Sequence, residues 1–432
     1  MQGIRWDSKA AFIFATAAAA IGLGNIWRFT FVVGENGGGA FVLLYLVCVF
    51  ALGFPLMLAE IVMGRLHRAN PVAVTRELAD SSGHARRWGW LGLLMLFSSF
   101  LILSYYVVIV GWVLHYSFHA LTHGYTGMTA ALAEKKFSSF SVDPIWSVGM
   151  TALVVIGGGV ILALGVKEGL EKAVMLMFPM MLVLMLVLIL YAVFNAKFMQ
   201  GLIYLFKPDF SKINTSTILS ALGQAFFSLN IAIGVTCMFS AYLPKGISVV
   251  RAALWVTVAD TGFAILAGLI IFPFVITYGL PFKAGPGLVF ETLPVAFAHM
   301  GLGRWVGVLF FFMLFFAAFS SVIALQEPIL AWLQEGFKLS RRTAVTVLSL
   351  AVFFVSLGTI GSFCWSSHFT FKGMTFFSVV DDLTAKILLP LGGVLLALFA
   401  GYVLKLPVVA KEFAWSESSR WLLSWRFILR WL

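Results

Sequence analysis

The sequence predicts an all-α polytopic membrane protein, and three observations support this fold class. Of the 432 residues, 61% are hydrophobic and only 11% are charged, whereas a soluble domain carries about 25% charged residues. Long apolar segments recur along the chain, each close to the ~20 residues that a helix needs to cross a bilayer. The segments do not alternate apolar and polar residues as barrel strands do, so we expect them to be helices.

Ten spans are expected, and they divide into two halves of five. We place a first repeat at about 5–195 and a second at about 216–405, followed by a basic tail at 405–432. Nothing outside the spans is long enough for a soluble core, so 1–432 is expected to form one membrane-embedded domain. The expected spans are 10–34, 39–64, 89–121, 146–165, 168–194, 218–241, 248–278, 303–334, 342–364 and 375–404.

The net charge of +11 raises the question of a nucleic-acid partner, and its distribution argues against one. If the N-terminus is on the inner side, most of the 29 Lys and Arg residues fall in the loops and termini of that side. An excess of cations in cytoplasmic loops is the positive-inside rule. The charge therefore indicates membrane topology, and no nucleic acid is expected to bind.

Two spans at matching positions in the two halves are interrupted. The first contains Gly22-Leu23-Gly24-Asn25, and the sixth contains Ser228-Leu229-Asn230 followed by Gly234. Broken helices at corresponding positions indicate a binding site near the bilayer midplane, because unwound backbone offers carbonyl oxygens to a cation and N–H groups to a carboxylate. Glycines alone would fit close helix packing, but Asn25 and the intramembrane Arg28 favour a functional interpretation.

Other polar residues stand out within the spans. Asp260 lies in the apolar seventh span, where a carboxylate costs ~2.5–3.5 kcal/mol unless a cation offsets it; contact with water at a span end is the alternative. The pair Ser320-Ser321 is a weaker signal, because serine in a membrane helix usually bonds to its own backbone.

Three histidines, His115, His119 and His123, recur at a spacing of four residues and share one helix face. This spacing can bind zinc, although a place in the interfacial belt is the commoner explanation. No P-loop, HExxH or GxSxG motif occurs, so the sequence does not predict an enzyme.

Five strings stand out along the chain: Gly22-Leu23-Gly24-Asn25-Ile26-Trp27-Arg28-Phe29, Glu35-Asn36-Gly37-Gly38-Gly39-Ala40-Phe41, Gly223-Gln224-Ala225-Phe226-Phe227-Ser228, Ala259-Asp260-Thr261 and Leu388-Leu389-Pro390-Leu391-Gly392-Gly393. Together they resemble the neurotransmitter:sodium symporter family, and most of all its bacterial amino-acid branch. The resemblance extends over essentially the whole chain. It implies a five-plus-five inverted-repeat fold with unwound first and sixth helices, in a bacterial inner (plasma) membrane with a cytoplasmic N-terminus. It also implies sodium-coupled symport of amino acids by alternating access.

The resemblance implies two sodium sites built from oxygen ligands, which suit a hard cation. Both sites combine backbone carbonyls of the first span with side chains of other spans. The first would use the Ala20 carbonyl, Asn25, Ser228, Asp260 and the substrate carboxylate; the second would use carbonyls of Ala18, Ile21 and Ala317 with the hydroxyls of Ser320 and Ser321.

The resemblance also implies where the substrate would bind. Its carboxylate would meet the backbone amides of Gly22, Leu23 and Gly24 and the Tyr106 hydroxyl, and its ammonium would meet carbonyls of Ala20, Phe227 and Ser228. The pocket for its side chain would be mainly apolar, which predicts a neutral, hydrophobic amino acid. A biogenic amine is less favoured, because Ala20 leaves the ammonium position without an acidic residue. The expected lining is Ile102, Tyr106, Phe227, Asn230, Ile233, Ser321 and Leu325.

Two charged pairs are expected to act as gates. Arg28 and Asp381 would form the outer gate, and Arg5, next to Trp6, would pair with Glu335 as the inner latch.

Departures from the family pattern lead to further expectations. Asp260 replaces an asparagine of several members, and Ala264 replaces a serine of chloride-dependent members, so we expect no chloride requirement. Asn230 stands where serine is common, which leaves the exact substrate open. The chain stops where relatives begin an eleventh span, so we expect either a truncation or the loss of that span. An amino-acid-binding membrane sensor without transport is the alternative function, and the oligomeric state stays unknown.

Overall fold

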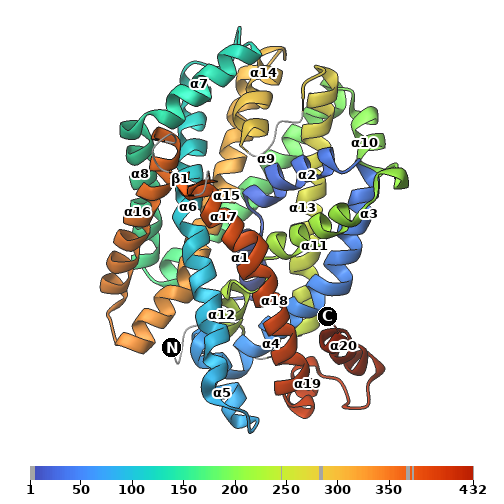
Figure 1. The fold of residues 1–432 in the computed structure, drawn as a ribbon, viewed down its shortest axis with the longest axis vertical. Coiled ribbons are helices and arrows are strands. Elements are labelled where there is room, and N and C mark those ends of the chain that lie inside the picture. Colours follow the sequence, from blue (N-terminus) through green and yellow to red (C-terminus); the bar gives the residue numbers. More distant parts are fainter. Residues whose placement is uncertain (1–4, 245, 282–285, 366–369, 372–373, 432) are drawn as a thin grey trace.

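The computed structural model describes residues 5–244, 246–281, 286–365, 370–371 and 374–431. Within these ranges, eight helices are long and apolar enough to cross a membrane, and one bent pair makes a ninth. Most run along the long axis of the molecule (Figure 1), and their bounds lie within a few residues of the predicted spans. They are Gly39–His67 (α3, η2, α4), Arg86–Thr122 (η3, α6), Pro144–Ala163 (α8), Val166–Asn195 (η4, α9), Val249–Thr277 (α13), Gly303–Phe337 (α15), Arg341–Cys364 (α16) and Phe376–Val403 (α17, η7, α18, η8).

The first predicted span is the bent pair. Helix α1 (Lys9–Ala20) begins after Ser8, whose side chain accepts from the Ala11 N–H, and it ends where Ile21 adopts an extended backbone. The chain becomes helical again in η1 (Gly24–Arg28) and α2 (Phe29–Glu35), at 58° to α1. The predicted interruption of the first helix is confirmed.

The sixth predicted span is also broken, into α11 (Thr215–Ser228) and α12 (Val235–Ala241). Between them Asn230, Ala232 and Gly234 have φ angles of 52°, 62° and 81°, in the left-handed region that a right-handed helix excludes. The predicted fold class, with unwound first and sixth helices, is therefore confirmed.

Shorter elements connect the spans. They include a two-stranded antiparallel pair in which Thr370 lies opposite Thr375. Helix α20 falls in the range predicted as a basic tail, but it is docked on the protein: Trp425 donates its indole N–H to the Pro55 carbonyl at 2.9 Å. The shorter elements are α5 (Pro71–Ser81), α7 (Ala130–Val142), α10 (Phe198–Phe206), η5 (Phe210–Lys212), η6 (Leu288–Thr292), α14 (Leu293–Ala298), β1 (Thr370–Phe371), β2 (Met374–Thr375), α19 (Leu406–Phe413) and α20 (Arg420–Trp431).

The broken helices lie inside the bundle, and the continuous helices surround them. Helix α1 packs against α9, α12, α13 and α15, and α12 packs against α4 and α15. The most apolar stretch of α15 is 78% buried, whereas that of α9 is 33% buried. Helix α15 is therefore central, and much of the apolar surface of α9 is left for lipid.

Candidate substrate and ion site

The unwound part of the sixth helix lies directly against the first helix. The Asn230 side-chain amide donates to the Ala19 carbonyl at 2.7 Å, and the Gln224 amide donates to the Gly24 carbonyl at 3.1 Å. Asparagine tolerates the left-handed backbone better than most residues, so Asn230 can both form this bend and reach across to α1. Two segments about 200 residues apart in sequence thus form one centre.

One buried carboxylate lies beside this centre, surrounded by polar side chains. Asp260 of α13 is fully buried; its Oδ1 accepts from the Asn25 amide at 2.7 Å and its Oδ2 from the Ser228 hydroxyl at 2.6 Å. The Asn25 Oδ1 accepts from the Gly22 N–H at 3.0 Å. Among the described residues, no ion pair supplies Asp260 with a cationic side chain. A buried carboxylate without a cationic partner is costly, and these oxygens are ligands that a hard cation prefers.

A second cluster of oxygens joins α15 to the end of α1. The Ser320 hydroxyl lies 2.8 Å from the Ala18 carbonyl and 2.9 Å from the Ala317 carbonyl. The Ser321 hydroxyl lies 3.3 Å from the Ile21 carbonyl. All five groups expected at the second sodium site are therefore adjacent in the structure. The Ala18 and Ile21 carbonyls face α15 because helix α1 ends between them.

A small cavity of about 20 Å³ lies where the broken helices meet α6 and α15. Every residue expected to contact the substrate lines it except Leu23, whose N–H donates to the Tyr106 hydroxyl at 3.1 Å. A water molecule needs about 10–15 Å³ by this measure, so the cavity is closed around little more than one water. Its lining is Ala20, Gly22, Gly24, Asn25, Ile102, Tyr106, Phe227, Ser228, Asn230, Ile233, Ser321 and Leu325.

A larger cavity of about 290 Å³ adjoins the small one, and Phe227 lines both. The Arg28 guanidinium lies 4.4 Å from the centre of the Phe227 ring, a cation–π contact. Asp381 lines the same large cavity, but the ion pairs of the described residues do not include one between Arg28 and Asp381. The two residues of the expected outer gate thus line the same cavity without forming an ion pair, and the Arg28 guanidinium instead contacts the Phe227 ring.

Comparison with known proteins identifies the family. The profile of the Sodium:neurotransmitter symporter family matches residues 4–133 and 139–430. The chain belongs to this family. It is 33% identical to a sodium-dependent transporter of Haemophilus influenzae, over 97% of this chain and 93% of that protein. It resembles the crystal structure of MhsT in complex with L-phenylalanine, with a TM-score of 0.91 and 36% identity over 99% of this chain and 96% of MhsT.

A more distant relative is the sodium-dependent nutrient amino acid transporter 1 of Drosophila grimshawi, 27% identical over 82% of this chain and 64% of that protein. Membership of the symporter family makes this chain a multi-pass, sodium-coupled transporter and not an enzyme. The recognition of the family from the sequence is confirmed.

The inner latch expected between Arg5 and Glu335 is not formed within the described part of the chain. The Glu335 carboxylate accepts from the Asn70 backbone N–H at 3.0 Å and also from the Asn70 side-chain amide, and Arg5 is exposed. Asn70 precedes α5 and already supplies two donors, so the carboxylate is satisfied without a cation. Trp6 is buried, and its indole N–H donates to the Phe239 carbonyl of α12 at 2.9 Å.

Sequence reasoning missed two buried acidic residues. Glu60 of α4 accepts from the Ala232 N–H at 2.7 Å and the Cys237 N–H at 3.3 Å, and so satisfies backbone groups that the break in the sixth helix exposes. Glu327 of α15 is paired with Arg341 at 2.6 Å. Each lies in a long apolar helix. A search for charged residues within the spans, the criterion that singled out Asp260, would therefore have found both.

The zinc interpretation of the three histidines is not supported. His115 stacks on Phe140 with ring centres 3.8 Å apart, and the Lys136 ammonium lies 3.0 Å from Nε2 of His119. A cation at this nitrogen opposes a metal ion. Across the described residues, no group of three or more His, Cys, Asp or Glu side chains is arranged to hold a metal.

Proposed function

We propose that this transporter carries neutral, hydrophobic amino acids into the cell together with sodium, by alternating access across a bacterial inner membrane. The observation that carries the proposal is the buried Asp260 carboxylate, held by the neutral side chains of Asn25 and Ser228 beside the small cavity. A monovalent cation bound there would offset the cost of burying the charge.

The first sodium ion would bind between Asp260, Ser228, Asn25 and the Ala20 carbonyl. The Asn25 amide would turn its oxygen toward the ion, and the Gly22 N–H that it now occupies at 3.0 Å would become free. A substrate carboxylate would accept from that N–H and complete the ion's ligands. The ion and the amino acid would then each strengthen the binding of the other, which is the thermodynamic basis of coupling.

The second sodium ion would bind the Ala18, Ile21 and Ala317 carbonyls with Ser320 and Ser321. These groups belong to α1 and α15, and the hydroxyls now bond to the carbonyls directly. An ion that replaced those hydrogen bonds would hold the two helices together by stronger contacts, and its loss would free α1 to move.

The chemistry of the cavity supports an apolar amino acid as substrate. Ile102, Phe227, Ile233 and Leu325 are aliphatic or aromatic, and no Asp, Glu, Lys or Arg lines the cavity. The complex of MhsT with L-phenylalanine is consistent with this choice. Because the cavity now measures about 20 Å³, its walls must separate to admit such a substrate.

Access would alternate by movement of the two broken helices. On the outer side, Arg28 and Phe227 separate the small cavity from the large one, and Asp381 would receive Arg28 when Phe227 moves. On the other side, Trp6 fastens the start of α1 to α12, and the exposed Arg5 remains available to Glu335 if Asn70 releases it. We place this basic end, with the N-terminus and the 405–432 tail, in the cytoplasm.

Uptake into proteoliposomes tests the proposed function. With an inward sodium gradient we expect saturable uptake of radiolabelled leucine, tryptophan or phenylalanine, and no uptake of glutamate, because the cavity offers no cation to a second carboxylate. A choline gradient is the control. Saturable binding of an apolar amino acid without uptake would instead favour the sensor, and the absence of both would exclude amino acids as ligands.

Transport is expected to be independent of chloride. The Asp260 carboxylate supplies beside the ion the negative charge that chloride would otherwise provide, and Ala264, one turn along α13, offers no hydroxyl to an anion. Replacing chloride by gluconate at constant sodium should leave the initial rate unchanged. A loss of most of the uptake in gluconate would contradict this prediction.

A further inference from the structure

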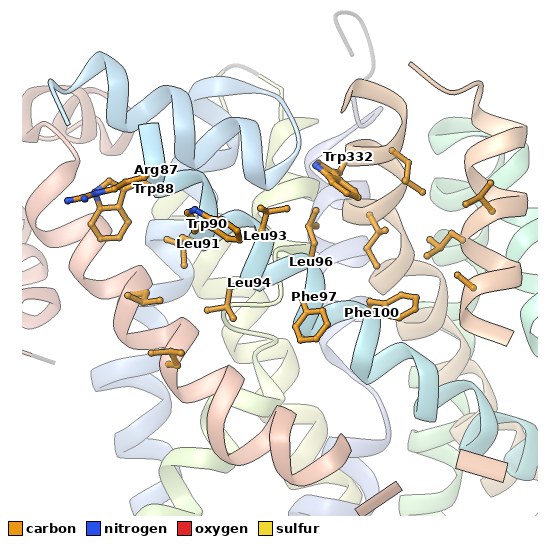
Figure 2. Close-up of a pocket in the computed structure, with 17 residues that line it drawn as sticks. Arg87, Trp88, Trp90, Leu91, Leu93, Leu94, Leu96, Phe97, Phe100 and Trp332 are labelled. Carbon is orange, nitrogen blue, oxygen red and sulfur yellow. The ribbon is translucent and has the colours of Figure 1, made fainter. Parts of the chain in front are cut away.

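A long apolar groove on the outer surface of the bundle has no role in the proposed transport cycle. It is formed by α6, α15, α16 and α18, has a volume of about 1,010 Å³ and lies at the end of α6 where the chain enters from α5 (Figure 2). Its surface is almost entirely apolar. The side chains of Trp90 and Phe97 are 73% and 50% exposed, so the groove is open to the hydrocarbon that surrounds the protein.

The groove has the depth of one membrane leaflet. Figure 2 shows Arg87, Trp88 and Trp332 at one edge, and Phe97 and Phe100 further along α6. From residue 87 to residue 100 a helix rises about 20 Å, which is about half of the ~40–45 Å that a bilayer spans with its head-group regions. Tryptophans are typical of the interface between hydrocarbon and head groups, so the edge with Arg87 matches the head-group level and Phe100 lies near mid-bilayer.

Among the residues that the structure describes, Arg87 is the one charged residue that lines the groove. In the described part of the chain it forms no ion pair, whereas the adjacent Arg86 pairs with Glu77 at 2.6 Å and Asp80 at 3.4 Å. Arg87 is exposed, and its guanidinium can contact a phosphate with two parallel hydrogen bonds. An unpaired guanidinium at the head of an apolar groove is complementary to a molecule with an anionic head and an apolar tail.

We propose that the groove is a binding site for one anionic phospholipid from the leaflet at the basic end of the protein. The lipid phosphate contacts Arg87, and an acyl chain lies along Leu94, Phe97 and Phe100. The excess of basic residues at this end of the chain attracts anionic lipids to the same leaflet.

The proposed lipid contacts helices that also form the substrate site. Beyond the deep end of the groove, the Ser99 hydroxyl of α6 donates to the Leu325 carbonyl of α15 at 2.8 Å. On the other wall, a Cβ added at Gly392 of α18 would lie 2.7 Å from the Ala232 side chain in the unwound sixth helix. The site therefore spans helices on both sides of the broken segment, yet it includes no residue of the ion or substrate site.

Native mass spectrometry of the full chain in detergent tests the site. The probes are phosphatidylglycerol and phosphatidylcholine with identical acyl chains. We expect the wild type to retain one phosphatidylglycerol more strongly than phosphatidylcholine. A cationic side chain near the membrane surface contributes about 1 kcal/mol to anionic lipid binding, so Arg87→Gln should weaken phosphatidylglycerol binding about 5-fold. It should weaken phosphatidylcholine binding less, because the choline cation offsets the charge of the phosphate.

Two further variants separate the charge from the groove. Arg86→Gln removes a neighbouring charge that is already paired, and we expect wild-type lipid binding. Ala351→Trp places a large ring in the groove and should reduce binding of both lipids, while the elution volume of the protein stays unchanged. Three results would each overturn the proposal. They are equal phosphatidylglycerol binding by the Arg87 and Arg86 variants, full lipid binding by Ala351→Trp, and a lipid-free dimer of the wild type that Ala351→Trp dissociates.

Discussion

Replacing Asp260 by alanine is expected to abolish sodium-dependent uptake and to weaken sodium binding at the first site by more than about 100-fold. The carboxylate is fully buried and, within the described ranges of the chain, is held only by the Asn25 and Ser228 side chains, so it would be the first sodium ion's charged ligand. Removal of one partner from a buried ionic pair costs ~3–5 kcal/mol, which is a factor of ~100 or more in affinity. Binding of radioactive sodium to the purified protein measures the loss directly.

The thermal stability of the same variant distinguishes a lost ligand from a damaged fold. Without sodium, the wild type buries a carboxylate that no cationic side chain of the described residues offsets, so Asp260→Ala should unfold at a temperature no lower than that of the wild type. Added sodium should stabilise the variant less than the wild type, because a ligand stabilises only the state that binds it and the variant keeps only the second proposed sodium site. Gly262→Ala, two residues along α13 in open space, is the matched control. Sodium stabilisation of Asp260→Ala equal to that of the wild type would show that the ion binds elsewhere.

Most of the architecture follows from local properties of the chain. The eight continuous spans match their predicted bounds within a few residues, because a bilayer imposes a minimum apolar length and charges mark the ends. The breaks were visible as well, since Gly22, Asn25, Asn230 and Gly234 are poor residues for the interior of an apolar helix. Local sequence therefore predicts where each helix runs and where it is broken.

The partners of polar groups were harder to predict, because pairing depends on packing between distant segments. Glu335 bonds to Asn70, 265 positions away, and not to Arg5. Arg28 lies over Phe227, although an ion pair with Asp381 had seemed as reasonable. Composition showed that these residues are unusual in a membrane, but it carries no information on which of several oppositely charged or polar groups lies nearest. The small size of the central cavity likewise depends on the packing of four helices.

Replacing Gly22 by alanine is expected to abolish amino-acid binding and uptake while sodium binding at the Asp260 site of the substrate-free protein changes little. A Cβ at this position would lie 2.6 Å from the Tyr106 hydroxyl and 2.8 Å from the Ser321 hydroxyl, where we propose that the substrate carboxylate binds. Overpacking costs ~1–3 kcal/mol, and a lost hydrogen bond to a charged group adds ~1.5–3 kcal/mol. Together these costs predict at least a ~60-fold loss of affinity, measurable by equilibrium binding of radiolabelled phenylalanine or leucine.

Two variants show whether the loss at Gly22 is steric and local. Gly223→Ala, at a position of α11 with no atom within 4 Å of the added carbon, should bind the amino acid as the wild type does. Adding Tyr106→Phe to Gly22→Ala removes the closest clashing atom, so the double variant should recover part of the amino-acid binding. The recovery is incomplete because the contact with Ser321 remains and the Tyr106 hydroxyl is lost as a donor to the substrate. If Gly22→Ala alone bound the amino acid normally, the carboxylate would not lie at these amides. Because Asp260→Ala removes the ion's ligand and Gly22→Ala blocks the substrate, a loss of sodium binding at the first site in the former and little change in the latter would separate the two sites of the coupled pair.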